Sequence, residues 1–128
     1  MSTPAKLSWL WVFAMLNYIY ADILTLMDPS VLRDIVSGNL DMVQITPEFL
    51  LMGAILMEIP IAMVVLSRIL KYRVNRWANI VAGLIKTLAV FASMFVGEPA
   101  AYYMFFGVIE ITTTLYIIWV AWRWTESK

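Results

Sequence analysis

The sequence contains no cysteine and no histidine. Their absence excludes disulfides, thiol catalysis, CxxC redox chemistry, axial histidine ligation of haem and histidine metal sites. It also removes the side chain that most often relays protons near neutral pH. Any titrating group must therefore be Asp, Glu, Lys, Tyr or Arg, and we predict neither a metal site nor a cofactor.

Charge is also scarce, at 14% of the 128 residues, whereas soluble domains average about 25%. Nine basic and nine acidic side chains give a formal net charge of zero, so nothing in the composition favours nucleic acid as a partner. Hydrophobic residues, in contrast, make up 62% of the chain. This composition, in a chain of one domain's length, indicates a single integral membrane domain over residues 1–128.

Four long apolar segments divide the chain, at about residues 7–27, 48–70, 76–97 and 100–122. Each can cross a bilayer as a helix, which needs about 20 residues. The sequence therefore predicts an all-α membrane protein, a four-transmembrane-helix up-down bundle. The first segment carries Asn17 and Asp22 and no cleavage site follows it, so we interpret it as a retained helix and not a signal peptide.

The loop between the first two segments contains two helix starts. Asp28 followed by Pro29 is typical of an N-cap and first turn, and Gly38 can end the helix that begins there. Apolar residues on one face predict a short amphipathic helix on the outer surface. Thr46 and Pro47 form a second cap and open the next long segment.

Basic residues are distributed unequally between the two ends of the predicted bundle. Seven lie near the termini or between the second and third segments, and one, Arg33, lies on the other side. By the positive-inside rule both termini are cytoplasmic, and we place the protein in the bacterial cytoplasmic (inner) membrane. The short connection SRILKYRVNR either serves this anchoring or binds anionic lipid headgroups through Arg68, Lys71, Arg73 and Arg76.

Each apolar segment contains one ionisable side chain well inside it, namely Asp22, Glu58, Lys86 or Glu110. At 1.5 Å per residue, the last three lie about 15 Å below the outer end of their helices and Asp22 about 8 Å below. Such residues cost about 2.5 to 3.5 kcal/mol each to insert and usually face the protein interior. We therefore predict that all four meet in one polar chamber.

Polar neighbours extend this predicted ligand- or ion-binding pocket. They are Asn17, Tyr18, Asn79, Tyr103 and Thr114. Three carboxylates and one ammonium would carry a net charge of minus two, so a low dielectric favours the neutral form of at least one acid. Pairing of Lys86 with one acid would explain only two of the four charges.

Pro60 lies inside the second segment, two residues after Glu58. Because proline has no N–H, the carbonyl of Leu56 loses its helical partner, and the helix is expected to kink there. A free carbonyl beside a carboxylate suits a cation, a water molecule or a ligand amine. The alternative is an ordinary proline kink, which is common in membrane helices.

The sequence resembles an uncharacterised bacterial family of small four-helix membrane proteins, a domain of unknown function. The resemblance is carried by NYIYADI (17–23), by the block that begins ITPEFLLMGAILMEIPIAM (45–63) and continues to residue 83, and by YYMFFGVIEITTTLYIIWVAW (102–122). It implies the four-helix topology and no established activity. In architecture the chain also looks like DoxX-type four-helix proteins.

Three classes of function remain open. A binding or transport protein would take up a proton, a small cation or an amphipathic amine, and conduction would need a homo-oligomer or a larger movement, since a four-helix bundle fills its own core. An intramembrane enzyme would use Glu58 or Glu110 as acid or base on a lipid-like substrate. A scaffold or partner subunit would use the charges for assembly. We favour the first class, because no nucleophile, metal set or nucleotide loop is visible.

Overall fold

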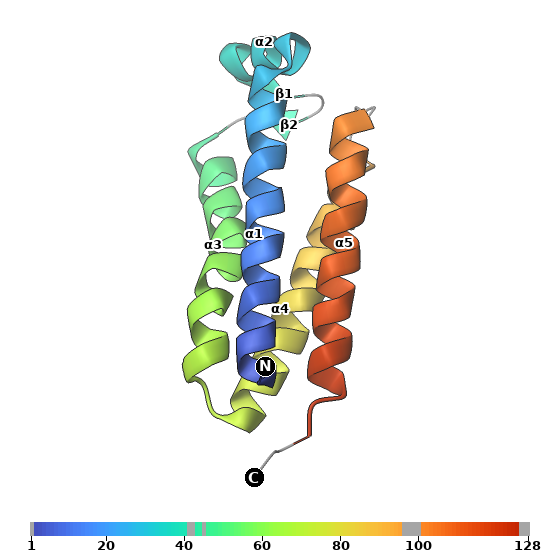
Figure 1. Cartoon of the computed structure of the whole chain (residues 1–128). Coiled ribbons are helices and arrows are strands. Elements are labelled where there is room, and N and C mark those ends of the chain that lie inside the picture. The colour runs from blue at the N-terminus through green and yellow to red at the C-terminus, as the bar shows by residue number, and fades with distance from the viewer. Residues whose placement is uncertain (1, 41–42, 45, 96–100, 126–128) are drawn as a thin grey trace.

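Four long helices form the body of the protein, and a short helix with a small hairpin lies at one end (Figure 1). The computed structural model describes residues 2–40, 43–44, 46–95 and 101–125. The long helices are α1 (Thr3–Met27), α3 (Pro47–Ile69), α4 (Tyr72–Ser93) and α5 (Ala101–Trp122). Between α1 and α3 lie α2 (Pro29–Ser37) and the antiparallel strands β1 (Asn39–Leu40) and β2 (Val43–Gln44).

The long helices alternate in direction along the chain (Figure 1). Helix α1 packs against α3 and α5, α4 packs mainly on α5, and the contact between α3 and α4 is smaller. Helix α1 begins and α5 ends at the end where α3 turns into α4, which we call the basic end. The opposite end carries α2 and is called the α2 end.

Local capping explains where the helices begin. The side chain of Thr46 accepts a hydrogen bond from the backbone N–H of Phe49, and Asp28 does the same for Ser30, which confirms both predicted N-caps. Gly38 ends α2 with a φ of 89°, a left-handed conformation that glycine adopts without strain. Helix α1 begins at Thr3 and not at residue 7, because Ser2 caps it ahead of the apolar run.

The turn between α3 and α4 is shorter than the sequence suggested. Helix α4 begins at Tyr72 and not at residue 76, and it ends at Ser93 and not at residue 97. The amide of Asn75 donates to the backbone carbonyls of Ser67, at 2.7 Å, and Leu70, at 3.3 Å. These carbonyls belong to the end of α3, where helical partners run out, so Asn75 holds the two helices in a tight turn.

The α2 end is tied to α5 through Asp28. Its carboxylate accepts hydrogen bonds from the Ser30 hydroxyl at 2.8 Å and from the Tyr102 hydroxyl at 3.0 Å. These bonds hold the pKa of the Asp28 carboxyl group below its ordinary value, because they favour the charged form. The link between the start of α5 and the α1–α2 corner therefore persists over the physiological pH range.

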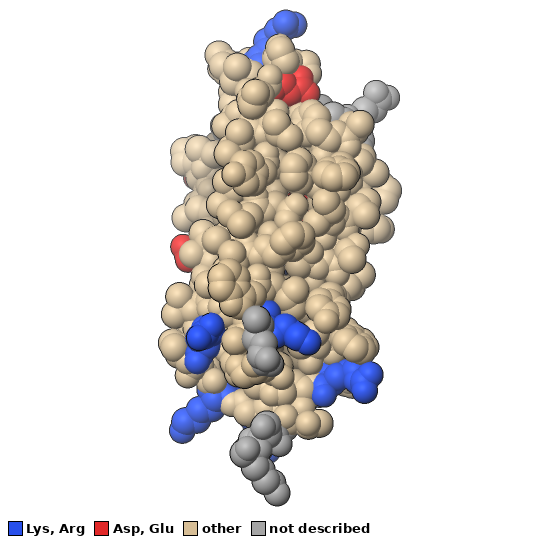
Figure 2. Space-filling model, in the orientation of Figure 1, with Lys and Arg blue, Asp and Glu red and all other residues tan. Residues whose placement is uncertain are grey.

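Helices α1, α3 and α5 are long and apolar enough to cross a membrane. Helix α4 does not belong to this set, although its polar residues Asn75, Asn79 and Lys86 are buried and its exposed face carries large apolar side chains. Exposed apolar residues on α4 include Trp77, Val81, Leu84, Leu88 and Phe91. Figure 2 shows a mainly uncharged surface between the ends, with most Lys and Arg side chains at the basic end.

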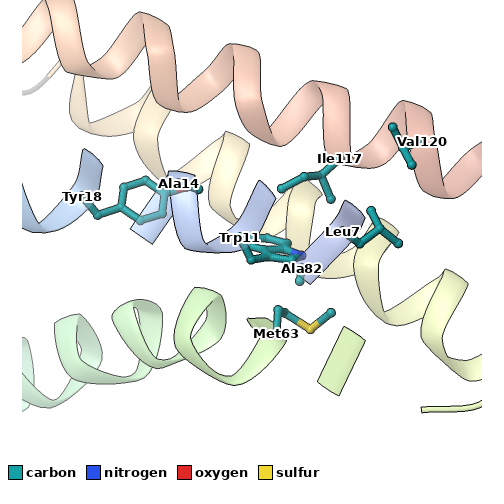
Figure 3. Close-up of a cluster of buried hydrophobic side chains, with 8 residues drawn as sticks. All are labelled: Leu7, Trp11, Ala14, Tyr18, Met63, Ala82, Ile117 and Val120. Atoms are coloured by element: carbon teal, nitrogen blue, oxygen red, sulfur yellow. The ribbon is translucent and has the colours of Figure 1, made fainter. Parts of the chain in front are cut away.

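A hydrophobic core runs along the inner face of α1. Leu7, Trp11, Ala14 and Tyr18 follow one another at helical spacing, and Met63 of α3, Ala82 of α4 and two residues of α5 close around them (Figure 3). Trp11 and Leu7 are fully buried. Because this core fills the basic half of the bundle, the buried charged side chains lie nearer the α2 end.

Candidate functional site

A group of charged and phenolic side chains lies between the helices on the α2 side of the hydrophobic core, and Tyr18 belongs to both. Lys86 on α4 is 4% exposed, Glu110 on α5 is 6% exposed and Tyr18 on α1 is 4% exposed. Lys86 lies within electrostatic reach of Glu110 and of Asp22, one helical turn beyond Tyr18 on α1. We call Tyr18, Asp22, Lys86 and Glu110 the inner charge group.

Lys86 makes its contacts with a backbone carbonyl and an aromatic ring. Its amine donates to the carbonyl oxygen of Leu56 at 3.3 Å, and it lies 4.2 Å from the centre of the Tyr18 ring. The Leu56 carbonyl is the one that Pro60 deprives of a helical N–H. This carbonyl, which could have bound a cation, a water molecule or a ligand amine, is thus bonded by an amine of the chain itself, and the bond joins α4 to α3.

Glu110 is buried beside this lysine without pairing with it. Among the described residues, its carboxylate forms neither an ion pair nor a hydrogen bond, and only its backbone carbonyl accepts a bond, from Thr114. The Tyr18 hydroxyl is likewise buried and has no hydrogen-bond partner in the described part of the chain. A buried carboxyl group and a buried hydroxyl are therefore both available to a further polar group.

Asp22 occupies a different position from the other three members. Its side chain is exposed, whereas Tyr18, Lys86 and Glu110 are buried. Asp22 lies five residues before the end of α1, about 8 Å from it along the axis. It therefore lies between the buried members of the group and the α2 end of the molecule.

Tyr103 and Thr114 flank Glu110 on α5. The Tyr103 hydroxyl donates to the Ser93 hydroxyl of α4, and this tyrosine is within electrostatic reach of Glu110 and Asp22. The Thr114 hydroxyl is 2.7 Å from the Thr87 hydroxyl, next to Lys86. Tyr103 thus joins α5 to α4 on the α2 side of Glu110, and Thr114 does so on the side of the basic end.

Glu58 does not face the inner charge group, contrary to the sequence-based expectation. Its side chain is exposed, in line with the exposed residues Ala54, Ile61 and Val65 on the outer face of α3. Helix α3 buries only Pro60, Met63 and Ser67. Its rotation therefore turns the proline inward and the carboxylate outward.

Asn79 also lies outside the group, in a second polar network nearer the basic end. Its side-chain oxygen accepts from the Trp11 indole at 2.7 Å and from the Ser67 hydroxyl at 3.3 Å, and its amide donates to Asn75. The side-chain hydrogen bonds of Asn79 are used within the protein, so it is a structural residue. Asn17 is separate again, because its amide bonds to the carbonyl of Phe13 on its own helix.

The sequence reasoning missed Trp11, Ser67 and Asn75 as members of this second network. Asn75 and Asn79 are four residues apart and share one face of α4 with Lys86. That repeated polar face was a signal for the inward side of α4. No comparable pattern marks Ser67 or Trp11, whose roles depend on which helices meet.

The four basic side chains of the predicted headgroup site, at the basic end, differ in exposure. Arg68, Lys71 and Arg73 are exposed. Arg76 instead donates to the carbonyls of Ala121, at 3.0 Å, and Trp122, at 2.9 Å. These are the last carbonyls of α5, so Arg76 caps that helix, whereas the other three remain accessible to anionic groups.

No group of three or more acidic side chains in the described part of the chain could hold a metal ion. What the fold and its side chains define is a helical protein with three helices of membrane-spanning length and a buried charge group. The chain belongs to the Family of unknown function (DUF6326), whose model matches residues 3–128. No curated protein and no solved structure matches it. The likeness to DoxX-type proteins therefore stays a prediction.

Proposed function

We propose that the inner charge group binds a proton or another small monovalent cation inside the membrane. The observation that carries this proposal is that Lys86 and Glu110 are both buried but do not pair with each other. Lys86 is used on the Leu56 carbonyl and the Tyr18 ring, which leaves the Glu110 carboxylate for a different cation.

Charge balance favours a single positive charge as the ligand. Asp22 and Glu110 contribute two negative charges when ionised and Lys86 contributes one positive charge, so the group has a net charge of minus one. One proton, monovalent ion or protonated amine neutralises it, and neutrality is strongly favoured at low dielectric. The unpartnered Tyr18 hydroxyl offers an oxygen to a hydrated ion or an amine.

Asp22 supplies a route to this group from the α2 end. A cation that enters there meets the exposed carboxylate of Asp22 first and the buried Glu110 afterwards. Further passage towards the basic end is blocked by the packed core around Trp11, so transport would require a helix movement. Binding of a cation from the α2 end is therefore the first step of any flux.

We further propose that all four long helices cross the bacterial inner membrane with both termini in the cytoplasm. Support for α4 comes from its inverted amphipathicity, since its polar side chains are buried and its apolar ones are exposed. Water would not favour such a surface, whereas lipid does. The basic end, with its exposed Arg68, Lys71 and Arg73, is the expected cytoplasmic side.

Infrared titration of the purified protein in lipid tests the binding proposal. The wild type should show a carboxylic C=O band that titrates and shifts when a monovalent cation is added. Glu110→Gln should remove this band, and the matched control Glu48→Gln, at an exposed residue in the first turn of α3, should keep it. An unchanged band in Glu110→Gln would refute the assignment.

Flux is measured separately in proteoliposomes that contain a pH dye. If the site lies on a transport path, Glu110→Gln should lower proton uptake driven by a membrane potential at least about ten-fold, which corresponds to about 1.4 kcal/mol. Glu48→Gln again serves as the control. Equal flux in wild-type, variant and empty liposomes would show that this protein does not conduct protons.

A further inference from the structure

Glu58 is placed where a lone carboxylate is least favourable in a membrane. It lies eleven residues from Pro47 and eleven from Ile69, at the middle of α3, about 16 Å from either end. Its side chain is exposed on the outer face of the bundle. A glutamate side chain is too short to reach either headgroup region from this depth, so it must find its partner among other molecules in the membrane.

Among the residues that the structure describes, no cation of the same chain is available as that partner. Lys86 is buried on α4 and donates to the Leu56 carbonyl. The remaining described Lys and Arg residues lie near the ends of the long helices or, like Arg33, on α2. A second copy therefore has no exposed cation at this depth to present to Glu58.

A second copy does, however, present its own Glu58. Two copies with the same orientation in a membrane are related by an axis along the membrane normal, so equivalent residues lie at equal depth. A residue close to that axis meets its own counterpart. Two protonated carboxyl groups brought together there can hydrogen-bond each other as a neutral pair, which satisfies both without any further cation.

The surface around Glu58 is suited to such contact. Ala54, Ile61 and Val65 continue its line along α3 and are exposed. The first turns of α3, residues 47–55, are exposed all round the helix. Gly53 has open space where a Cβ would lie, so another helix can approach closely.

We infer that the outer face of α3 is a two-fold interface between two copies of this chain, centred on a hydrogen-bonded pair of Glu58 carboxyl groups. This interface is distinct from the inner charge group, and neither needs the other. Helix α3 is the least buried of the three candidate spans, and the interface explains why it keeps a carboxylate on its exposed side.

Cross-linking on a wild-type Glu58 background tests the interface directly. The chain has no cysteine, so a single introduced cysteine reports without interference. Ile61→Cys, one turn from Glu58, should form a disulfide-linked dimer in native membranes. Phe105→Cys, exposed on α5, should not. Absence of the Ile61→Cys dimer, or equal cross-linking at both positions, would overturn the inference.

Substitution of Glu58 then tests the carboxyl pair. Glu58→Leu should raise the dimer dissociation constant in lipid nanodiscs by about ten-fold, since it removes the interhelical hydrogen bonds. Glu58→Lys should dissociate the homodimer by repulsion, yet form a heterodimer with wild type. Asp34→Lys, on α2 and away from the outer face of α3, is the control and should do neither. A wild type that remains monomeric, or that carries a different protein on this face, would refute the proposal.

Discussion

A proline and a lysine from different helices complete one hydrogen bond in this protein. Pro60 leaves the Leu56 carbonyl without its helical donor, and the Lys86 amine takes that position at 3.3 Å. The same amine lies on the Tyr18 ring. The charged amine of Lys86 on α4 thus contacts both α3 and α1.

A double-mutant cycle tests this use of Lys86. Lys86→Met should lower the free energy of unfolding in mixed micelles by about 1 to 3 kcal/mol, because it leaves the Leu56 carbonyl buried and unpaired. In the Pro60→Ala background the loss should be smaller, since the N–H restored at position 60 can bond to that carbonyl. Strictly additive losses would contradict the pairing.

Lys71→Met provides the matched control for this cycle. Lys71 is exposed at the basic end and has no side-chain hydrogen bond at the start of α4. Its replacement should change the free energy of unfolding by less than about 0.5 kcal/mol. A loss as large as that of Lys86→Met would point to a general effect of removing positive charge.

Helix α4 approaches α5 closely at Gly83. A Cβ built there would lie 2.6 Å from Cγ1 of Ile118 and 3.4 Å from the Thr114 carbonyl oxygen. This close approach brings the backbones of α4 and α5 together one turn from Lys86 and Glu110. The absence of a side chain at Gly83 therefore allows the short distance between the two helices that carry Lys86 and Glu110.

Two glycine substitutions of the same kind should therefore have opposite effects. Gly83→Ala is expected to lower the free energy of unfolding by about 1 to 3 kcal/mol, because Ile118 must move. Gly53→Ala, which meets open space within a single copy, should be neutral or stabilising by up to about 1 kcal/mol in the monomeric protein. Both are measured by reversible unfolding in mixed micelles. Equal effects would argue against close packing of α4 on α5.

The distribution of side chains over the whole molecule suits lipid on its long sides and water at its ends. Most Lys and Arg side chains gather at the basic end in Figure 2, and the middle of that face is mainly uncharged. Apolar groups cover the exposed faces of all four long helices. The proposed cytoplasmic position of both termini rests on this distribution and the positive-inside rule.

Single cysteines test the orientation and the number of spans. In intact cells an impermeant maleimide should label Asp34→Cys on α2 but not Arg73→Cys at the α3–α4 turn. Thr125→Cys, just after α5, decides whether α4 crosses the membrane. With four spans it is protected until the cells are permeabilised, and with three spans it is labelled from outside.

The positions of the helices follow from local features of the sequence. Asp28, Thr46 and Gly38 act within a few residues, so their caps and stops could be identified without a partner helix. Long apolar runs, each with one ionisable residue well inside it, indicated α1, α3 and α5. The inward side of α4 can also be identified from the sequence, because the polar residues Asn75, Asn79 and Lys86 lie on one face of the helix.

The direction in which each glutamate faces depends instead on how the helices pack. Helix α3 is apolar nearly all round, so no periodic pattern fixes its rotation, and packing against α1 turned Pro60 inward and Glu58 outward. Glu110 faces inward because of the way in which α5 packs closely against α4. Depth along a helix follows from counting residues, whereas direction around it depends on neighbours distant in the sequence.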